Sequence, residues 1–440
     1  MNQKQVITRM APSPTGNFHI GGVRTALYNY LFARQHGGTF ILRSEDTDKE
    51  RSKPEYEKNM LAIFDWLGLE YDAFYRQSER TEIYKEHIHK MIDSGHAYEA
   101  EDNQSGTGKV IRFKNPNTRI TFTDMILGDI SVQTDDLEDF VIARDIENPL
   151  YHLTVVVDDG LMGVTHVIRG QEHVANTPRQ ILLLEALGFA RPTYAHLPLI
   201  MSPRGGKLSK RDPEVIPTLD YDAQGILPQA LLNFLALIGW NPGTDQEIFT
   251  KEEFIQLFNL EKVQKGGGVF NTEKLDWINK EWLSKMTDQE FKDYLGDTWN
   301  TFTIRPEASE LFLGLVRERI AKRSDIHIMI QEGEFTYLND NITYPAEALV
   351  WKKSTAETTL RHLEKLAELL NTEVQWDMDN VKSLIWEYAE EQGKGDVLWP
   401  MRYALSGREK SPDPITLAVI LGKEKTLERI HNAAQLLTAL

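Results

Sequence analysis

The sequence contains no cysteine among its 440 residues. Disulfide bonds are therefore impossible, and zinc sites built on thiolate ligands are excluded. The 12 histidines offer no ligand-like pattern in their place. The closest pair, His87 and His89, is spaced so that the two rings would not share one face of a helix. We expect no bound structural metal.

Long apolar runs are missing as well. No stretch approaches about 18 consecutive apolar residues, the length that indicates a membrane-spanning helix. The first residues, Met1–Gln5, lack the apolar core of a signal peptide. We therefore expect a cytoplasmic protein. At about 150 residues per domain, a chain of this length predicts roughly three domains.

Positive charge is in the minority. The chain has 49 Lys and Arg against 66 Asp and Glu, a net charge of −17 at pH 7, which argues against a surface coated with positive charge for nucleic acid. Binding depends on the local potential, however, and cations are dense at Arg317–Arg323 and at Arg204–Arg211. The interpretation that the protein binds nucleic acid through one basic face therefore stays open.

The N-terminal region carries a segment rich in glycine and proline, Ala11–Gly22, which reads Ala-Pro-Ser-Pro-Thr-Gly-Asn-Phe-His-Ile-Gly-Gly. It follows a short apolar run and precedes a helical pattern over Val23–Arg34, so it predicts a strand, a loop and a helix. Glycines let the backbone approach a ligand closely, and a helix start attracts phosphate. His19, just before this helix, is suited to donate a hydrogen bond to a phosphate.

A second segment lies in the middle of the chain, Gly206–Arg211, which reads Gly-Lys-Leu-Ser-Lys-Arg. The glycines that precede its lysines predict a loop that closes over a triphosphate. Alone, each segment has an ordinary explanation, a turn for the first and a solvated cationic surface for the second. Together they are interpreted as the two halves of an ATP site.

The rest of the chain is predicted from its periodicity. Residues 1 to about 98 alternate apolar strands and helices, as in Thr39–Arg43 and Lys53–Leu67, which indicates a doubly wound parallel sheet. Residues 99 to 148 change to polar turns and short strands and are predicted to form a β-rich insert. We expect the sheet to resume with a strand over Leu150–Val157. Beyond residue 212 the patterns are helical, including a buried helix over Leu227–Ile238 and one that starts after Asp413.

The two loop segments resemble the paired signatures of class I aminoacyl-tRNA synthetases, and their surroundings resemble the glutamyl enzymes of bacterial type. Further blocks of the resemblance follow in the same order as in that family and continue to the end of the chain: Arg43–Asp48, Tyr75–Arg80, Val156–Asp159, Thr165–Gly170, Gly239–Gly243, Val269–Leu275, Leu398–Gly407 and Leu421–Leu427.

The resemblance implies an α/β fold with a Rossmann-like catalytic domain over residues 1–200, in which the insert 99–148 is a reduced subdomain for the acceptor end of tRNA. Residues 201–285 are expected to form the lysine loop and a helical domain that contacts the tRNA stem. Residues 286–440 are expected to form an all-helical anticodon-binding region. The segment between Tyr98 and Ile111 is shorter than is usual in the family. Because it contains no cysteine, no zinc is expected there.

By the same resemblance, ATP with Mg²⁺ and L-glutamate bind side by side. His19, Lys207 and Lys210 are the predicted catalytic residues, since they would stabilise negative charge on the phosphates. The predicted ATP-binding residues are Thr15, Gly16, His19, Gly21, Gly22, Lys207, Ser209, Lys210 and Arg211. The predicted glutamate-binding residues are Arg9, Ser13, Glu45, Tyr151 and Arg169. An arginine guanidinium can form two parallel hydrogen bonds to a carboxylate, and a glutamate side chain can pair with an ammonium group.

The implied reaction is the activation of glutamate to glutamyl-adenylate, followed by its transfer to tRNA(Glu), with tRNA(Gln) left open as a second acceptor. Arg317, Arg319 and Arg323 are candidate tRNA contacts, and a solvated helix face is their ordinary alternative. We expect a monomer. Two other interpretations stay open at this stage: a class I nucleotidyltransferase that needs no tRNA, and a catalytically silent RNA-binding homologue.

Overall fold

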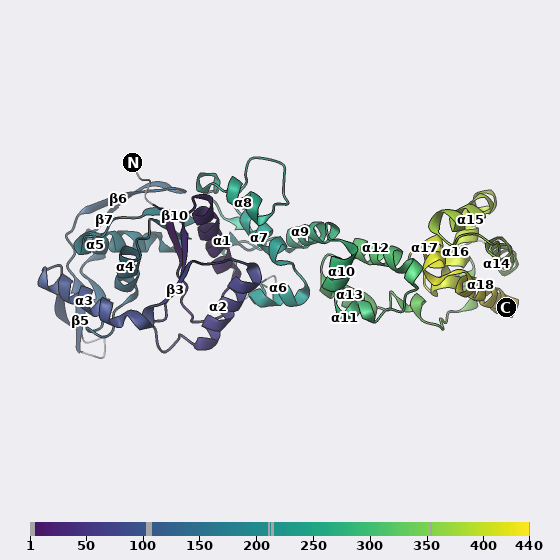
Figure 1. Cartoon of the computed structure of the whole chain (residues 1–440), viewed down its shortest axis with the longest axis horizontal. Coiled ribbons are helices and arrows are strands. Elements are labelled where there is room, and N and C mark those ends of the chain that lie inside the picture. Colours follow the sequence, from purple (N-terminus) through teal and green to yellow (C-terminus); the bar gives the residue numbers. More distant parts are fainter. Residues whose placement is uncertain (1–4, 103–107, 210–211, 213–214, 353, 440) are drawn as a thin grey trace. The chain divides into compact units, whose positions relative to one another are not determined.

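The computed structural model describes residues 5–102, 108–209, 212, 215–352 and 354–439. Its contacts divide the chain into two compact units, Met1–Trp282 and Leu283–Leu440. Figure 1 labels the elements of both units. In the described residues, no helix is long and apolar enough to span a membrane.

The first unit begins with three parallel strands and the helices that connect them. Strand β1 pairs with β2, and β2 pairs with β3. Helix α1 follows the proline-rich loop (residues 11–19) as predicted, but it begins at Ile20, three residues before the predicted start at Val23. Helix α2 has proline at its first position and ends at Gly68, whose positive φ of 61° suits a left-handed C-cap. The elements are β1 (Ile7–Met10), α1 (Ile20–Gln35), β2 (Thr39–Ser44), α2 (Pro54–Leu67) and β3 (Ala73–Arg76).

A second sheet has the strand order β7-β6-β10-β9. Its strand β9 lies beside β1. Just before β9, the Thr165 N–H donates to the carbonyl of Ile7, the first residue of β1 (3.0 Å). The change of direction in strand order therefore falls between β1 and β9, where doubly wound folds bind their ligands. The strands are β6 (Arg119–Asp124), β7 (Gly128–Gln133), β9 (His166–Gly170) and β10 (Thr193–Leu197).

The residues predicted as an insert divide between two sheets. Strands β4, β5 and β8 form a separate antiparallel sheet, whereas the β6–β7 hairpin extends the second sheet through the parallel pair of β6 with β10. The three strands of the separate sheet are β4 (Ala97–Asp102), β5 (Gly108–Phe113) and β8 (Phe140–Ala143).

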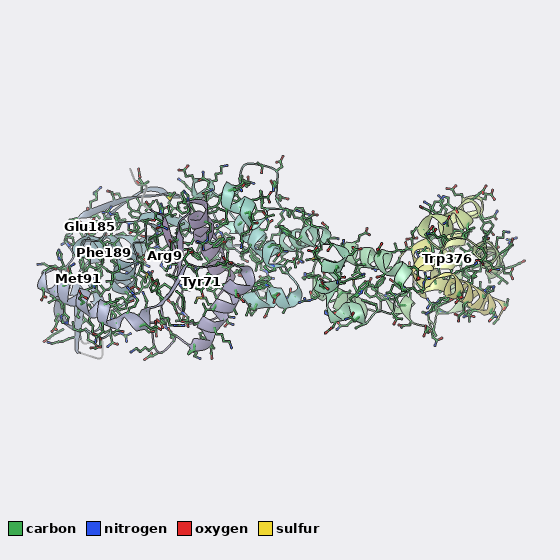
Figure 2. All side chains as sticks on the ribbon, viewed as in Figure 1. Arg9, Tyr71, Met91, Glu185, Phe189 and Trp376 are labelled. Atoms are coloured by element: carbon green, nitrogen blue, oxygen red, sulfur yellow. The ribbon has the colours of Figure 1, made fainter. Side chains whose placement is uncertain are left out.

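The strand predicted over Leu150–Val157 is wrong, since these residues lead into helix α4 (Tyr151–Leu161). The run of β-branched residues favours a strand locally, but such preferences yield to tertiary packing. Leu153, Val156 and Val157 are fully or nearly fully buried at helical spacing. Helix α4 packs against α3 (Thr81–Asp93) and α5 (Thr177–Leu187) in an apolar core that includes Met91, with Phe189 against it (Figure 2).

The first unit closes with short elements that support the lysine loop. Strand β11 (Ile200–Met201) pairs in parallel with β12 (Gly268–Val269), which lies almost seventy residues later. Helices α7 and α8 pack on α1 and share its apolar core, which includes Trp240. The helices of this region are α6 (Thr218–Gln224), α7 (Pro228–Leu237), α8 (Lys251–Leu257) and α9 (Thr272–Ser284).

The described residues of the second unit contain helices and no β-strand. Asp413 caps α17 as predicted, since its Oδ1 accepts from the N–H groups of Ile415 and Thr416. Every residue of α17 is buried, and each large aliphatic side chain there contributes about 1.5–3 kcal/mol. Trp376 donates from its indole N–H to the Ala418 carbonyl at 2.9 Å (Figure 2).

The helices of the second unit are α10 (Asp288–Leu295), α11 (Asp297–Asn300), α12 (Ser309–Arg319), α13 (Arg323–Gln331), α14 (Ala356–Leu370), α15 (Met378–Gln392), α16 (Lys394–Ser406), α17 (Pro414–Leu421) and α18 (Lys423–Thr438).

Candidate active site

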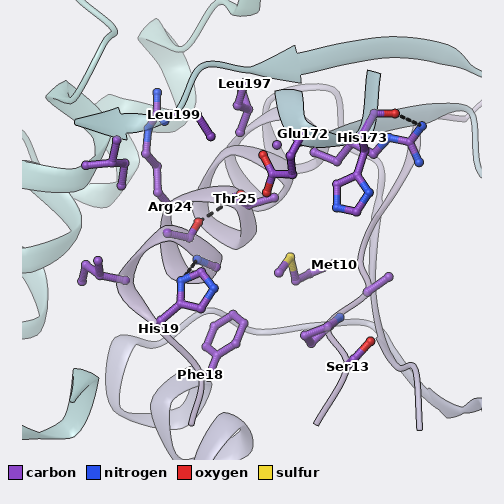
Figure 3. A pocket seen from close by; sticks show the side chains of 18 of the residues that line it. Met10, Ser13, Phe18, His19, Arg24, Thr25, Glu172, His173, Leu197 and Leu199 are labelled. Carbon is purple, nitrogen blue, oxygen red and sulfur yellow. Dashed lines mark hydrogen bonds between the residues drawn. The ribbon is translucent and has the colours of Figure 1, made fainter. Parts of the chain in front are cut away.

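A cavity of about 600 Å³ opens beyond the carboxyl ends of β1 and β9 (Figure 3). This volume lies within the range of small-molecule sites. The proline-rich loop and the start of α1 form one side of it. The ends of β9 and β10, the lysine loop, Glu45 after β2 and the start of α4 line the other sides. Two sequence segments separated by almost two hundred residues thus line one space.

His19 occupies the N-cap position of α1. Its Nδ1 accepts a hydrogen bond from the Gly22 N–H at 3.2 Å (Figure 3). In the neutral ring this contact leaves the proton on Nε2, so Nε2 is the donor. The first turn of α1 contains no acidic residue. The positive end of the helix dipole and a donor imidazole therefore stand at the same edge of the cavity.

The lysine loop is anchored at its base. Met201 in β11 forms a β-bridge with Lys207. The Asp212 carboxylate accepts from the Ser202 hydroxyl at 3.2 Å and from the Ser209 N–H at 2.6 Å, which folds the loop back on itself. Lys207 and Ser209 line the cavity. Lys210 and Arg211 lie outside the described residues.

A buried ionic cluster lies behind the side of the cavity that Arg9 and Glu45 line. Arg9 donates from Nε to Asp159 (3.2 Å), and the wholly buried Arg43 donates to Asp159 (2.8 Å) and to Glu45 (3.0 Å). Burial alone raises the pKa of Asp159, but Arg9 and Arg43 outweigh it, so the pKa of Asp159 is lowered. Burial prevails at Glu45, whose pKa is raised despite Arg43.

The neighbouring carboxylate, Asp158, faces away from the cavity. It accepts from Gln77 (2.8 Å), Arg80 (2.7 Å) and the Tyr84 hydroxyl (2.8 Å). A helix places Asp158 and Asp159 on adjacent faces, so Asp158 reaches Arg80 and Asp159 reaches Arg9, while Arg43 lies between them and pairs with both (3.7 Å to Asp158). This pairing gives a physical reason for α4 to be a helix rather than a strand.

Tyr151, the first residue of α4, lies beside His173, which follows β9 by three residues. The Tyr151 hydroxyl and His173 Nδ1 are 3.2 Å apart, and Asn176 donates to the same nitrogen from 3.1 Å. Burial, and then the nearby Arg169, lower the pKa of His173 to about 4. The imidazole is therefore neutral near pH 7 and adds no charge to the cavity.

Arg169 is almost fully buried and is held by neutral acceptors. It donates to His196 Nε2 (3.2 Å), Gln180 Oε1 (2.7 Å), the Thr177 hydroxyl (2.8 Å) and the His173 carbonyl (3.4 Å). Within the part of the chain that the structure describes, Arg169 has no carboxylate partner. Burial lowers its pKa, although an arginine keeps its charge at neutral pH.

All predicted ATP and glutamate residues that the structure describes line this one cavity. They are Arg9, Ser13, Thr15, Gly16, His19, Gly21, Gly22, Glu45, Tyr151, Arg169, Lys207 and Ser209. Among the described residues there is no group of three or more histidine and carboxylate side chains placed to hold a metal ion.

The candidate tRNA contacts lie in the second unit and already have intramolecular partners. Arg317 donates to Asp288 at 2.8 Å and lies over the Phe291 ring, and Arg319 is paired with Glu334. Arg323 lies over the Tyr294 ring, 5.7 Å from its centroid. Contact with tRNA would therefore compete with existing pairs at Arg317 and Arg319.

Sequence reasoning missed several residues of the site. Glu172 and His173 line the cavity (Figure 3), and Arg24 reaches it from α1, where it donates to the Pro198 carbonyl at 2.7 Å. Their position was the available signal. His173 follows Arg169 by four residues, and Arg24 follows His19 by five, so both are close in sequence to a predicted site residue.

Two family models match the chain. The model for the catalytic domain of class I tRNA synthetases (E and Q) matches residues 5–105 and 99–277, and the model for an anticodon binding domain matches residues 264–434. The first model covers more than half of the chain and contains the whole cavity.

Relatives with the same activity match over nearly the full length. The chain is 37% identical to a glutamate–tRNA ligase of Aquifex aeolicus, over 99% of this chain and 100% of that one, and 40% identical to glutamate–tRNA ligase 1 of Acidithiobacillus ferrooxidans, over 98% and 99%. A glutamate tRNA ligase of Elizabethkingia meningosepticum, solved in complex with its amino acid, matches with a TM-score of 0.88 and 32% identity over 98% and 99%. The chain therefore belongs to the glutamate–tRNA ligases, a family of class I aminoacyl-tRNA synthetases.

Proposed function

We propose that the cavity binds L-glutamate and ATP side by side and joins them as glutamyl-adenylate. The observation that carries this proposal is the meeting of two cationic regions in one space. The α1 start with His19 and Lys207 forms one region, and the buried Arg9 and Arg169 form the other. A nucleotide triphosphate suits the first region and a dicarboxylic amino acid the second.

Glutamate is held by opposite charges in this scheme. Arg9 and Arg169 take the two carboxylates, Tyr151 adds a hydroxyl, and Glu45 pairs with the ammonium group. The raised pKa of Glu45 is consistent with this role, because burial outweighs the effect of Arg43 and a further cation would stabilise the ionised carboxylate. The similar Elizabethkingia enzyme, solved with its amino acid, supports an amino-acid pocket in this fold.

The reaction needs no nucleophilic side chain. One oxygen of the glutamate α-carboxylate attacks the α-phosphorus of ATP, the bond to the pyrophosphate oxygen breaks, and a mixed anhydride and pyrophosphate result. His19, Lys207 and the α1 start stabilise the charge that develops on the phosphates. Mg²⁺ enters with the nucleotide, because this ion commonly binds through substrate phosphates. A terminal hydroxyl of tRNA then takes the glutamyl group and releases AMP.

The tRNA contacts follow from the same proposal. We infer that residues 201–285 contact the tRNA stem, that 286–440 read the anticodon and that the β-rich region within 99–148 meets the acceptor end. Lys210 and Arg211 complete the lysine loop in this scheme. The monomeric state and the cytoplasmic location stay predictions, and gel filtration tests the first.

Pyrophosphate exchange tests the chemistry directly. Exchange is measured with glutamate and ATP, with and without tRNA(Glu), for the unchanged protein and for Lys207→Met and His19→Ala. Loss of one such donor should reduce turnover by about 10²–10³. Lys90→Met, exposed on α3 and remote from the cavity lining, is the matched control. Normal exchange in both cavity variants would overturn their roles. Acylation of tRNA(Glu) and tRNA(Gln) then defines the acceptors.

A further inference from the structure

A buried row of three side chains extends from β6 through β10 to β9. His196 is fully buried between Asp124 and Arg169. Its Nδ1 is 2.6 Å from Asp124 Oδ2, and its Nε2 accepts from Arg169 Nε at 3.2 Å. Only Arg169 of the three lines the cavity. Asp124 and His196 are therefore connected to the cavity through Arg169.

The donors around Asp124 fix its charge state. Oδ1 accepts from the N–H groups of Ile126 (3.0 Å) and Leu127 (2.9 Å), and Oδ2 accepts from the His196 N–H (3.0 Å) as well as from its ring. Burial raises the pKa of Asp124, but the His196 ring and the two backbone donors outweigh burial and lower it. The carboxylate is ionised and accepts all four bonds.

The charge state of Asp124 determines the tautomer of His196. An ionised carboxylate can only accept, so the ring proton lies on Nδ1. Burial lowers the pKa of His196 below its ordinary value, so the ring is neutral and Nε2 carries a lone pair. Two groups lie 3.2 Å from this nitrogen: Arg169 Nε, which donates to its lone pair, and the Thr177 hydroxyl. The other acceptors of Arg169, on Gln180, Thr177 and His173, are neutral as well.

This arrangement orients the Arg169 guanidinium without neutralising its positive charge. A carboxylate in direct contact with Arg169 would fix the guanidinium but would also neutralise it. A neutral imidazole fixes the direction of Nε–H and leaves the positive charge for a ligand. The His196 ring separates the negative charge of Asp124 from Arg169, and the Asp124 carboxylate already accepts four hydrogen bonds.

We propose that Asp124 and His196 are positioning residues for amino-acid binding, which hold Arg169 as an oriented cation without a carboxylate in direct contact, so that it selects a carboxylate over an amide. The proposal rests on the proposed function, in which Arg169 binds a glutamate carboxylate. It adds that this cation depends on one tautomer of one buried histidine, set by a strand of the β6–β7 hairpin.

Asp124→Asn tests the tautomer. The variant keeps the shape of the side chain, but its amide nitrogen donates to His196 Nδ1 and moves the ring proton to Nε2. Two donors then face each other across the His196–Arg169 contact. The KM for glutamate should rise at least about tenfold, the KM for ATP should change less than about twofold, and discrimination against glutamine should fall. Exchange is measured with tRNA(Glu) present. Nitrogen-15 NMR of histidine-labelled protein should report the proton shift.

Substitutions at His196 keep the proposal testable if Asp124→Asn does not fold. His196→Gln offers an amide oxygen to Arg169 Nε and should hold the glutamate KM within about threefold of the unchanged enzyme. His196→Leu fills a similar volume without an acceptor and should raise this KM at least about tenfold. Equal glutamate KM values for the two variants would overturn the proposal.

Arg169→Gln separates this proposal from the function on which it rests. If Arg169→Gln leaves the glutamate KM unchanged, the assignment of Arg169 to glutamate is wrong and both proposals fall. If Arg169→Gln raises the glutamate KM but Asp124→Asn moves the His196 proton without raising it, only the positioning role is wrong.

Discussion

The Arg9 guanidinium and the Asp159 carboxylate lie 3.2 Å apart, although 150 residues separate them in the chain. The same carboxylate accepts from Arg43, so one buried oxygen pair serves two cations. Arg9 belongs to the strand before the proline-rich loop, and Asp159 belongs to α4. This contact fixes the direction of an arginine that is proposed to bind substrate.

Asp159→Asn should destabilise the first unit and weaken glutamate binding together. Removing one partner of a buried ion pair costs about 3–5 kcal/mol, because the remaining charge loses its compensation. Urea unfolding measures the loss of stability, and pyrophosphate exchange measures the glutamate KM. Glu82→Gln is the control, since Glu82 is exposed and its partner Lys85 keeps Glu147. That control should shift stability by less than about 1 kcal/mol. Equal effects of the two substitutions would contradict the buried role of Asp159.

Gly22→Ala should impair ATP use without unfolding the protein. A Cβ at this position would lie 2.6 Å from the Phe18 ring, which is itself buried beside His19. The ring must shift, and the loop that carries His19 shifts with it. We expect the KM for ATP to rise about tenfold or more, since Gly22 also donates to the imidazole. Gly314→Ala on α12, where a Cβ meets no atom within 4 Å outside its own helix, should leave exchange unchanged.

The loop segments could be predicted from the sequence because their signals are local. Glycine, proline and a histidine at a helix start specify a phosphate-binding turn within a dozen residues, and the structure has β1, the loop and α1 in that order. The predicted fold class is confirmed by the catalytic and anticodon-binding family models and by the similar solved structure. The predicted activity is confirmed by the curated relatives.

The partners of the site residues could not be predicted in the same way. Asp159 meets Arg9 across 150 positions, and Asp124 meets His196 across 72. Such pairs depend on which helices and strands become neighbours in the fold, and no local sequence pattern predicts those neighbours. The strand expected over Leu150–Val157 failed for the same reason, since its β-branched run is a local preference and the helix follows from tertiary burial and ion pairing.

The first unit should lose stability as the pH falls from about 6.5 to about 4. Burial, followed by nearby cations, lowers the pKa of both His152 and His173 to about 4. In this window the unfolded chain binds protons that the folded chain does not, so unfolding is favoured as the pH falls. Each histidine contributes at most about 1.4 kcal/mol per pH unit. Urea midpoints between pH 4.5 and 7.5 measure the slope.

His152→Gln provides the check on this assignment. The variant removes one of the two histidines whose pKa is lowered to about 4, so the slope of stability against pH should become smaller than in the unchanged protein. His152 is not among the residues that line the cavity, so its replacement tests stability apart from substrate binding. An unchanged slope in the variant would show that other groups account for the acid sensitivity.

Two adjacent glycines give the sharpest test of how the lysine loop is supported. Gly266 and Gly267 lead into β12, which pairs with β11 at the base of that loop. A Cβ on Gly267 would lie 2.5 Å from the Leu199 carbonyl oxygen, a backbone atom that cannot move without shifting β11. A Cβ on Gly266 would meet nothing within 4 Å. Gly267→Ala should therefore displace Lys207 and reduce exchange at least about tenfold.

Gly266→Ala should stay within about twofold of the unchanged enzyme. The two substitutions add the same methyl group to neighbouring positions, so composition and the local entropy of the unfolded chain change almost equally. A difference between them reports the contacts of the added methyl group with the Leu199 carbonyl and the Met201 side chain, both at the base of the lysine loop. Equal exchange rates would mean that β11 adjusts without moving Lys207, and the β11–β12 pair would then have no part in positioning the lysine loop.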